Sequence, residues 1–186
     1  IWASSLAKKE SQMEDLKSTL ERMVKSLGTD IKGLEAKVNA LMKLPDRIEV
    51  ENLPKTMAWA MDSGDRELWL SIWSDDIHYV VPQYDIDIRG KKALQEFGET
   101  AIFTREERKF SALTNIMVDV TGDTATGRDY YMHYGYPVNP ETGKASEERV
   151  LSEGMHFYQF GKRDGVWKIT RFEVHLNRRQ EAGAER

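Results

Sequence analysis

Four long strand-like segments, connected by two short turns and a longer loop at 137–146, make up the second half of the chain and constrain the fold most strongly. Glycine-containing turns at 121–124 and 161–165 connect consecutive segments, as in antiparallel hairpins. The residues before them have the pattern of two helices, a strand, a short extended piece at 84–88 and a third helix. Helices followed by a run of antiparallel strands predict an α+β domain. The expected strands are 77–82, 110–120, 124–136, 147–160 and 166–177, and the expected helices are 46–62, which Pro54 should kink or split, 65–73 and 90–103.

Residues 1–45 have a different pattern, that of a helical arm. Apolar residues recur every three or four positions, as in a coiled coil, with one phase jump between Leu27 and Ile31. One helix cannot bury such a seam, so the arm either packs on its own domain or pairs with the arm of another subunit. The narrow apolar stripe favours pairing between subunits, since it suits a helix better than a sheet. The seam consists of Met13, Leu16, Leu20, Met23, Leu27, Ile31, Leu34, Val38 and Leu41.

The sequence therefore predicts three parts: an oligomerisation arm at 1–45, a domain at 46–178 and a flexible tail at 179–186. Apolar residues on both faces of the later strands, such as Val150 and Leu151, indicate a sheet that is covered on both sides. Helices of the same subunit would cover one side, and a partner subunit the other. We expect a homo-oligomer, a dimer or trimer, held through the sheet and the arm.

Composition and charge exclude several classes of function. The absence of Cys excludes disulfides, thiolate metal ligands, iron–sulfur clusters and a cysteine nucleophile. With 27 Lys and Arg against 31 Asp and Glu, the net charge of −4 provides no surface for nucleic acid or an anionic membrane. Metal-binding histidine spacing, a phosphate-binding loop and a dinucleotide motif are missing, so we expect no cofactor and no metal. We expect a cytoplasmic protein, although a chain beginning at Ile1 leaves open a cleaved signal upstream.

Three segments resemble, in order, signatures of the nuclear-transport-factor-2-like (NTF2-like) superfamily in its SnoaL-like branch. They are the stretches at 58–76, 88–94 and 162–169. The resemblance covers about residues 46–178 and implies a cone-shaped, curved antiparallel sheet wrapped around helices. The branch includes scytalone dehydratase and hexachlorocyclohexane dehydrochlorinase, which are eliminating enzymes without a cofactor. The same fold also hosts isomerases, formaldehyde lyases and non-catalytic modules, so the fold does not decide the function.

Asp62 is the first candidate catalytic residue. It closes a predicted helix whose last residues, 59–61, are apolar. Apolar neighbours and the negative end of the helix dipole both disfavour a charged carboxylate, which suits a proton-accepting base. The resemblance implies the same role, because the Asp of this motif is the catalytic base or its partner in the eliminating relatives. The alternative is a turn residue, since Asp-Ser-Gly-Asp is ordinary turn chemistry.

The chain lacks the partner histidine that the resemblance implies. In the eliminating relatives this histidine lies a few residues before a Thr-Asn pair. Here the pair is Thr114-Asn115, and Ser111 occupies about the position of the histidine. If an imidazole takes part, it must therefore come from elsewhere in the chain.

Strand alternation indicates which side chains share a pocket. The inward row of the strand at 124–136 is counted in steps of two from the hairpin at 121–124, and the next strand has an alternating row of small and polar residues. By the same alternation, His78 and His175 fall on outward faces. The alternative for a histidine on an inward row is a structural, hydrogen-bonded role, and a β-bulge would reverse a row. We expect one pocket with Asp62, His133 and His156 as catalytic residues and Tyr79, Asp129, Tyr131 and Ser152 as substrate-binding residues.

These residues support hypotheses from two classes. The first is a cofactor-free lyase that removes water, or formaldehyde by retro-aldol cleavage, from a small hydroxylated aromatic or polycyclic substrate. Asp62, alone or through His133 or His156, would take the proton, and a double-bond isomerase is the neighbouring enzyme. The second is a non-catalytic, ligand-binding oligomeric module. An Asp62 that reaches a strand histidine favours the enzyme, whereas an Asp62 bonded only to its own turn favours the module.

Overall fold

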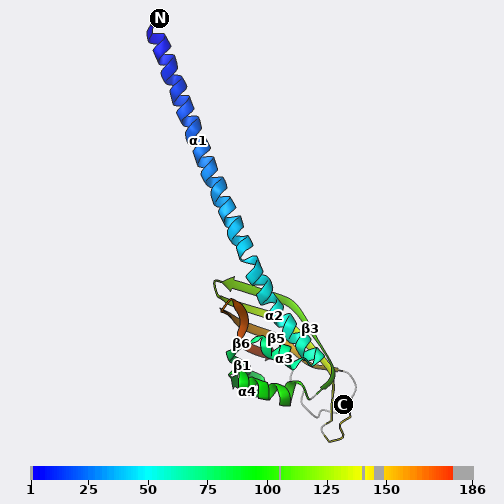
Figure 1. Cartoon of the computed structure of the whole chain (residues 1–186). Helices are drawn as coiled ribbons and strands as arrows, with labels where there is room; N and C mark the ends of the chain where they lie inside the picture. Colours follow the sequence, from blue (N-terminus) through cyan, green and yellow to red (C-terminus); the bar gives the residue numbers. More distant parts are fainter. Residues whose placement is uncertain (1, 105, 140, 145–148, 178–186) are drawn as a thin grey trace. The chain divides into compact units, whose positions relative to one another are not determined.

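The computed structural model describes residues 2–104, 106–139, 141–144 and 149–177 (Figure 1), with side chains placed from residue 12 onward except at 106–109 and 149. The chain forms two compact units, Ile1–Leu44 and Pro45–Arg186. The first unit is mainly one long helix, α1 (Trp2–Met42). Within the described residues, no helix is both long enough and apolar enough to cross a membrane. The predicted tail at 179–186 lies outside the described residues.

The second unit contains helices, then strands, in the order that the sequence predicts, so the α+β class is confirmed. Its helical part precedes four long antiparallel strands at the end of the chain. The elements are α2 (Leu44–Ser63), α3 (Arg66–Ser71), β1 (Trp73–Val81), a 3₁₀ turn (Pro82–Tyr84), β2 (Ile86–Arg89), α4 (Lys91–Phe97), a π-helical turn (Gly98–Ile102), β3 (Glu106–Thr121), β4 (Thr124–Pro137), β5 (Arg149–Arg163) and β6 (Val166–Leu176).

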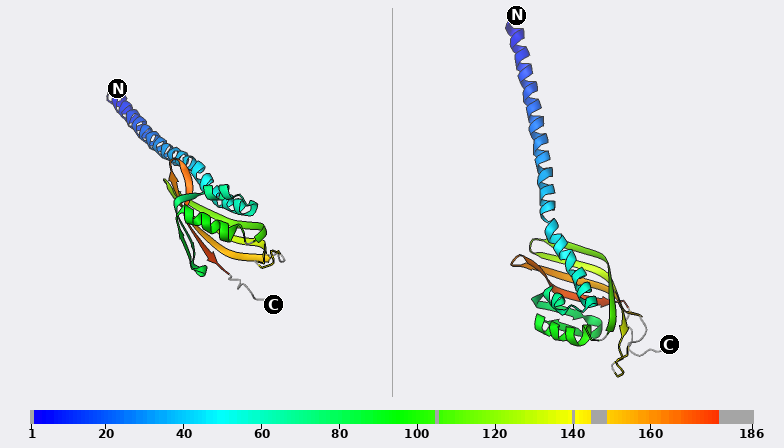
Figure 2. Two further views of the ribbon diagram at one scale, coloured as in Figure 1. Left: turned by 60° about the horizontal axis from the view of Figure 1, so that its bottom comes forward. Right: turned by 45° about the vertical axis from the view of Figure 1, so that its right-hand side comes forward.

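The strands form one six-stranded sheet in the order β2-β1-β6-β5-β4-β3. Neighbouring strands are antiparallel except β1 and β6, which run parallel, so the expected antiparallel sheet has one parallel pair. The sheet is curved, and α2, α3 and α4 lie on its concave side (Figure 2). The main core fills the space between these helices and the sheet. Its largest fully buried side chains include Trp69, Trp73 and Phe160.

Two predicted helices differ from the observed ones for identifiable reasons. α2 continues through Pro54, so the predicted split does not occur. Asp65 caps α3 as expected, since its carboxylate accepts a hydrogen bond of 2.9 Å from the Leu68 amide. α3 nevertheless ends at Ser71, and Trp73 begins β1 instead of ending the helix. The prediction was wrong here because Trp69 and Trp73 have helical spacing, although Trp69 belongs to α3 and Trp73 to β1 and each is buried in the core.

A β-bulge in β3 changes which side chains face the core. The residue pairs of β3 and β4 shift by one position between Thr114↔Tyr130 and Met117↔Arg128. Asn115, with φ of 53°, lies in this shift in the left-handed region that Asn tolerates better than most residues. An extra residue reverses the alternation of a strand. Ser111 therefore faces the core although simple alternation from Val118 would point it outward.

Candidate active site

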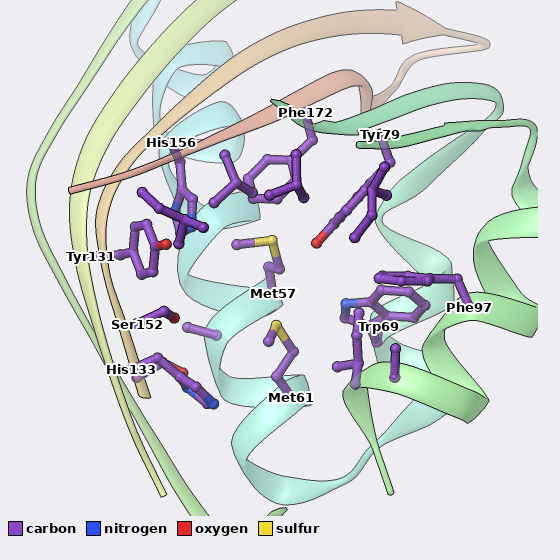
Figure 3. Close-up of a pocket in the computed structure, with 18 of the residues that line it drawn as sticks. Met57, Met61, Trp69, Tyr79, Phe97, Tyr131, His133, Ser152, His156 and Phe172 are labelled. Atoms are coloured by element: carbon purple, nitrogen blue, oxygen red, sulfur yellow. The ribbon is translucent and has the colours of Figure 1, made fainter. Parts of the chain in front are cut away.

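A cavity of about 450 Å³ lies between the helices and the concave face of the sheet (Figure 3). Met57 and Met61 of α2, with aromatic side chains, give it an apolar lining. Strands β3, β4 and β5 contribute the polar side chains Ser111, Tyr131, His133, Ser152 and His156, and the hydroxyl-bearing Tyr79 and Tyr84 come from β1 and the 3₁₀ turn. The described lining contains no Lys, Arg, Asp or Glu, so the cavity suits a neutral molecule.

Asp62, Ser111 and His133 form a hydrogen-bonded relay at one end of this cavity. The Ser111 backbone amide donates to Asp62 Oδ2 and the Ser111 hydroxyl donates to Asp62 Oδ1, both at 2.8 Å. His133 Nδ1 lies 3.0 Å from the same hydroxyl oxygen. The pairing of β3 with β4 places Ser111 directly opposite His133, and the end of α2 brings Asp62 to them. Three elements far apart in the sequence therefore meet at one hydroxyl group.

The relay determines which His133 nitrogen carries the hydrogen. A serine hydroxyl has one hydrogen, and an ionised carboxylate can only accept. Because Ser111 gives its hydrogen to Asp62, its oxygen must accept a hydrogen bond from His133 Nδ1–H. In the neutral ring, Nε2 then carries the lone pair. A proton taken up at Nε2 would make an imidazolium whose Nδ1–H is linked through Ser111 to the Asp62 carboxylate.

Asp129, Tyr158 and His156 form a second, more deeply buried cluster. The Tyr158 hydroxyl donates to Asp129 Oδ2 at 2.7 Å, and its oxygen lies 3.1 Å from His156 Nδ1. Asp129 Oδ1 is 2.9 Å from the same nitrogen but off the axis of a hydrogen bond. Because the Tyr158 hydroxyl gives its one hydrogen to Asp129, its oxygen accepts a hydrogen bond from His156 Nδ1–H. In the neutral His156 ring, Nε2 then carries the lone pair. Tyr131 stacks on the His156 ring with centroids 4.0 Å apart.

Burial lowers the pKa of His156 below its ordinary value, and the Asp129 carboxylate opposes this effect only in part. A charge on His133 acts in the same direction as burial, because two like charges repel. The two imidazoles of the cavity therefore disfavour simultaneous protonation. This leaves His156 neutral when His133 takes up a proton.

Acidification is expected to destabilise the fold through His156. The unfolded chain protonates this side chain near an ordinary pKa of about 6.5, whereas the folded chain does so only at lower pH. Between these two pH values the unfolded state binds more protons, so the free energy of unfolding falls as the pH falls below about 6.5. Urea unfolding between about pH 7 and about pH 5 should show this slope in the wild type and a shallower one in His156→Gln. Equal slopes would assign the effect to another group.

The opposite wall of the cavity offers hydrogen-bond donors. Among the described residues, the indole nitrogens of Trp69 and Trp73 are buried without a hydrogen-bond partner, and the nitrogen of Trp69 faces the cavity in Figure 3. Burial raises the pKa of the Tyr79 hydroxyl far above its ordinary value and that of Tyr131, which lies on the histidine side of the cavity, to about 12. Both phenols stay protonated at neutral pH. Buried donors of this kind would pair with oxygen atoms of a bound molecule.

The structure brings the predicted site residues together, but in two layers. Tyr79, Tyr131, His133, Ser152 and His156 line the cavity. Asp62, predicted to act alone or through a histidine, and Asp129, predicted to bind the substrate, do not line it and lie behind the two histidines. Sequence reasoning missed the linking role of Ser111 and Tyr158. Tyr158 could have been found, because it continues the inward row of Ser152 and His156.

The outward histidines form a separate group on the other face of the sheet. His78 bonds to Asp87 and contacts Arg171, while His175 bonds to Glu173. Neither lines the cavity. In the part of the chain that the structure describes, no group of three His, Asp or Glu side chains is placed to hold a metal ion.

Residues 42–173 match the sequence model of the SnoaL-like domain. No curated protein matches the chain in sequence. Similar solved structures include hexachlorocyclohexane dehydrochlorinase LinA-type3 from Novosphingobium barchaimii, with a TM-score of 0.65 at 20% identity, covering 75% of this chain and 91% of that one. A protein of Novosphingobium aromaticivorans with the provisional name scytalone dehydratase has a TM-score of 0.63 at 20% identity, covering 73% and 87%.

A further similar structure is an NTF2-like protein with a cystatin-like fold from Novosphingobium aromaticivorans. It has a TM-score of 0.62 at 23% identity and covers 79% of this chain and 90% of that one. At these identities the structures show a shared fold. The second unit therefore has the NTF2-like, cystatin-like fold that the sequence predicts, with a curved sheet that is not closed.

Proposed function

Because the chain belongs to the SnoaL-like family and holds two carboxylate-backed imidazoles in an apolar cavity, we propose that it is a cofactor-free lyase. Its substrate is a small, neutral, hydroxylated aromatic or polycyclic molecule. The relay from Asp62 through Ser111 to His133 is the observation that carries this proposal. A carboxylate that reaches a cavity histidine through one hydroxyl supports an enzyme more than a binding module, for which a turn-bonded Asp62 would suffice.

His133 acts as the base in this proposal. Its Nε2 takes a proton from a substrate carbon, the electron pair of the C–H bond forms a double bond, and the neighbouring C–O bond breaks toward oxygen. The imidazolium returns the proton to that oxygen, so water leaves and His133 is neutral again. Ser111 and Asp62 stabilise the imidazolium between these steps. General acid–base help of this kind contributes about 10²–10⁴ in rate.

The remaining cavity residues bind and orient the substrate. His156, held neutral by burial, accepts a hydrogen bond from a substrate hydroxyl through Nε2, and Asp129 fixes its ring orientation from behind. Tyr79, Tyr131 and Ser152 offer hydroxyl groups to the substrate oxygens. Retro-aldol loss of formaldehyde would use His133 and His156 in the same roles. His133 takes the proton from a substrate hydroxyl group, the C–C bond breaks as formaldehyde forms, and the proton returns to the carbanion. An isomerase would return it to another carbon.

Asp62→Asn tests the proposal against a panel of hydroxylated aromatic compounds, with the products identified by mass spectrometry. We expect the wild type to make a product lighter by water or formaldehyde and the variant to make it about 10²-fold more slowly. Asp65→Asn is the matched control, because Asp65 caps α3 outside the cavity and Asn also caps helices. It should retain the wild-type rate.

Other outcomes of this experiment point elsewhere. A product of unchanged mass with a shifted absorbance would indicate the isomerase. Binding of panel members without turnover by either protein would favour a non-catalytic, ligand-binding module. An Asp62→Asn variant as fast as the wild type would show that the relay does not take part.

We also propose that the sheet takes part in a homo-oligomer, a dimer or trimer. Large apolar side chains lie exposed on strands β3, β4 and β5: Phe110, Met117, Tyr130 and Phe157. Isolated apolar side chains on a surface need no explanation, but a group of them on neighbouring strands is typical of an interface.

A further inference from the structure

The apolar seam of α1 is symmetric about Leu27. Counted toward the N-terminus, its side chains follow at steps of 4, 3, 4 and 3, and the steps toward the C-terminus are the same. All nine side chains lie on one continuous helix and are between 53% and 68% exposed. The phase jump in the heptad pattern produces this symmetry, because an uninterrupted heptad repeat read outward from Leu27 has opposite step orders in the two directions.

We propose that α1 pairs with α1 of a second copy of this chain, antiparallel, about a twofold axis at Leu27. A twofold interface brings the same surface patch of both copies together, so each seam residue must meet its mirror position in the seam. The symmetric spacing meets this condition at every layer. The layers are Met13 with Leu41, Leu16 with Val38, Leu20 with Leu34, Met23 with Ile31, and Leu27 with Leu27.

Charged residues beside the seam favour the antiparallel orientation over the parallel one. In a parallel pair, flanking positions five residues apart face each other, which would place Asp30 against Glu35 of the partner subunit twice. In the antiparallel pair, Lys17 lies next to Glu35 of the partner subunit, again twice. Two like-charge contacts are thus replaced by two contacts of opposite charge.

Val24 and Gly28 fit the same arrangement. Val24 lies outside the seam and is 66% exposed, which the helix alone does not explain. In the antiparallel pair Val24 lies beside Gly28 of the partner subunit on each side of the Leu27 layer. A side-chain atom at Gly28 would meet nothing within 4 Å, so the helix leaves open space there for a branched side chain. This contact closes the centre of the interface.

Disulfide trapping tests the pairing and its orientation, because the wild-type chain has no cysteine. Full-length Met13→Cys and Leu41→Cys, carrying tags of different mass, are mixed and oxidised with diamide. We expect a cross-linked heterodimer in the mixture and at least tenfold less cross-linking when either variant is oxidised alone. Ser18→Cys, on the side of α1 opposite the seam, is the matched control and should cross-link no more than free thiols in solution do.

Each other outcome overturns the proposal. Strong cross-linking of each variant alone, without the heterodimer, would establish a parallel pair. A Leu27→Cys variant is trapped in either orientation, so its failure to cross-link would show that the arms do not pair. The same conclusion would follow if light scattering found a monomer at micromolar concentration.

Discussion

Replacing His133 with Gln is expected to lower kcat about 10²–10⁴-fold on the substrate that the panel identifies. The amide of Gln has no basic nitrogen, so it cannot take a proton where the His133 ring lines the cavity. The side chain is only half-buried, and we therefore expect the melting temperature to change little. Steady-state kinetics and thermal unfolding of the same preparation measure the two effects.

His78→Gln is the matched control, since His78 is a strand histidine on the other face of the sheet. It should retain the wild-type kcat. Ser111→Ala should lower kcat less than His133→Gln, because the imidazole remains and only its link to Asp62 is lost. The double variant should be no slower than His133→Gln alone, since Ser111 acts through His133.

Nitrogen-15 NMR of the histidine side chains gives a readout that needs no substrate. In the wild type, the neutral His133 ring should carry its hydrogen on Nδ1, and in Ser111→Ala this preference should weaken. If Nδ1 is already unprotonated in the wild type, the relay as described is wrong. A wild-type rate in His133→Gln would instead exclude His133 as the base while leaving the relay intact as a structural feature.

The inward row of β4 was predictable because a short turn sets the register of its hairpin with β3. Val120 pairs with Ala125 across the turn at 121–124, and steps of two from Ala125 lead to Asp129 and His133. The same reasoning placed Tyr79 inside and His78 outside. These positions depend on local turn geometry and alternation, which are both visible in a single sequence.

The direction of Ser111 was not predictable in this way. It depends on the one-residue bulge at Asn115, and alternation alone says nothing about where a strand gains an extra residue. Without the bulge, Ser111 would point away from Asp62 and the relay could not form. The cross-strand pairing of Asp129 with His156 was similarly hidden, because the longer connection between β4 and β5 does not set a register.

The order of carboxylate and imidazole also required the structure. A pattern of residue types indicates that Asp62 and Asp129 share a pocket with two histidines, but it does not show which group faces the substrate. In both clusters the carboxylate lies behind and the imidazole lines the cavity. This arrangement is physically reasonable, since a charge facing an apolar cavity would lose hydration without gaining a partner.

Asp129→Ala is expected to lower the free energy of unfolding by about 1–3 kcal/mol. The variant removes the acceptor of the Tyr158 hydroxyl and the negative charge beside His156 Nδ1, both of them buried. The buried Tyr158 hydroxyl cannot turn to water, so it keeps its desolvation cost without an acceptor, whereas His156 Nδ1–H keeps the Tyr158 oxygen and loses only the nearby charge. Asp129→Asn retains one oxygen and should lose less. Urea unfolding at neutral pH, with m-values compared, measures both variants.

Asp119→Ala provides the control for removing a strand carboxylate, because Asp119 is exposed on β3 and should change the free energy of unfolding by about 0.5 kcal/mol or less. Equal losses in Asp119→Ala and Asp129→Ala would contradict the structural role of the buried cluster. If Asp129→Asn remains folded but its substrate affinity falls, the cluster holds His156 in its binding orientation as well as stabilising the sheet. The buried carboxylate would then serve the site through the side chain that it supports.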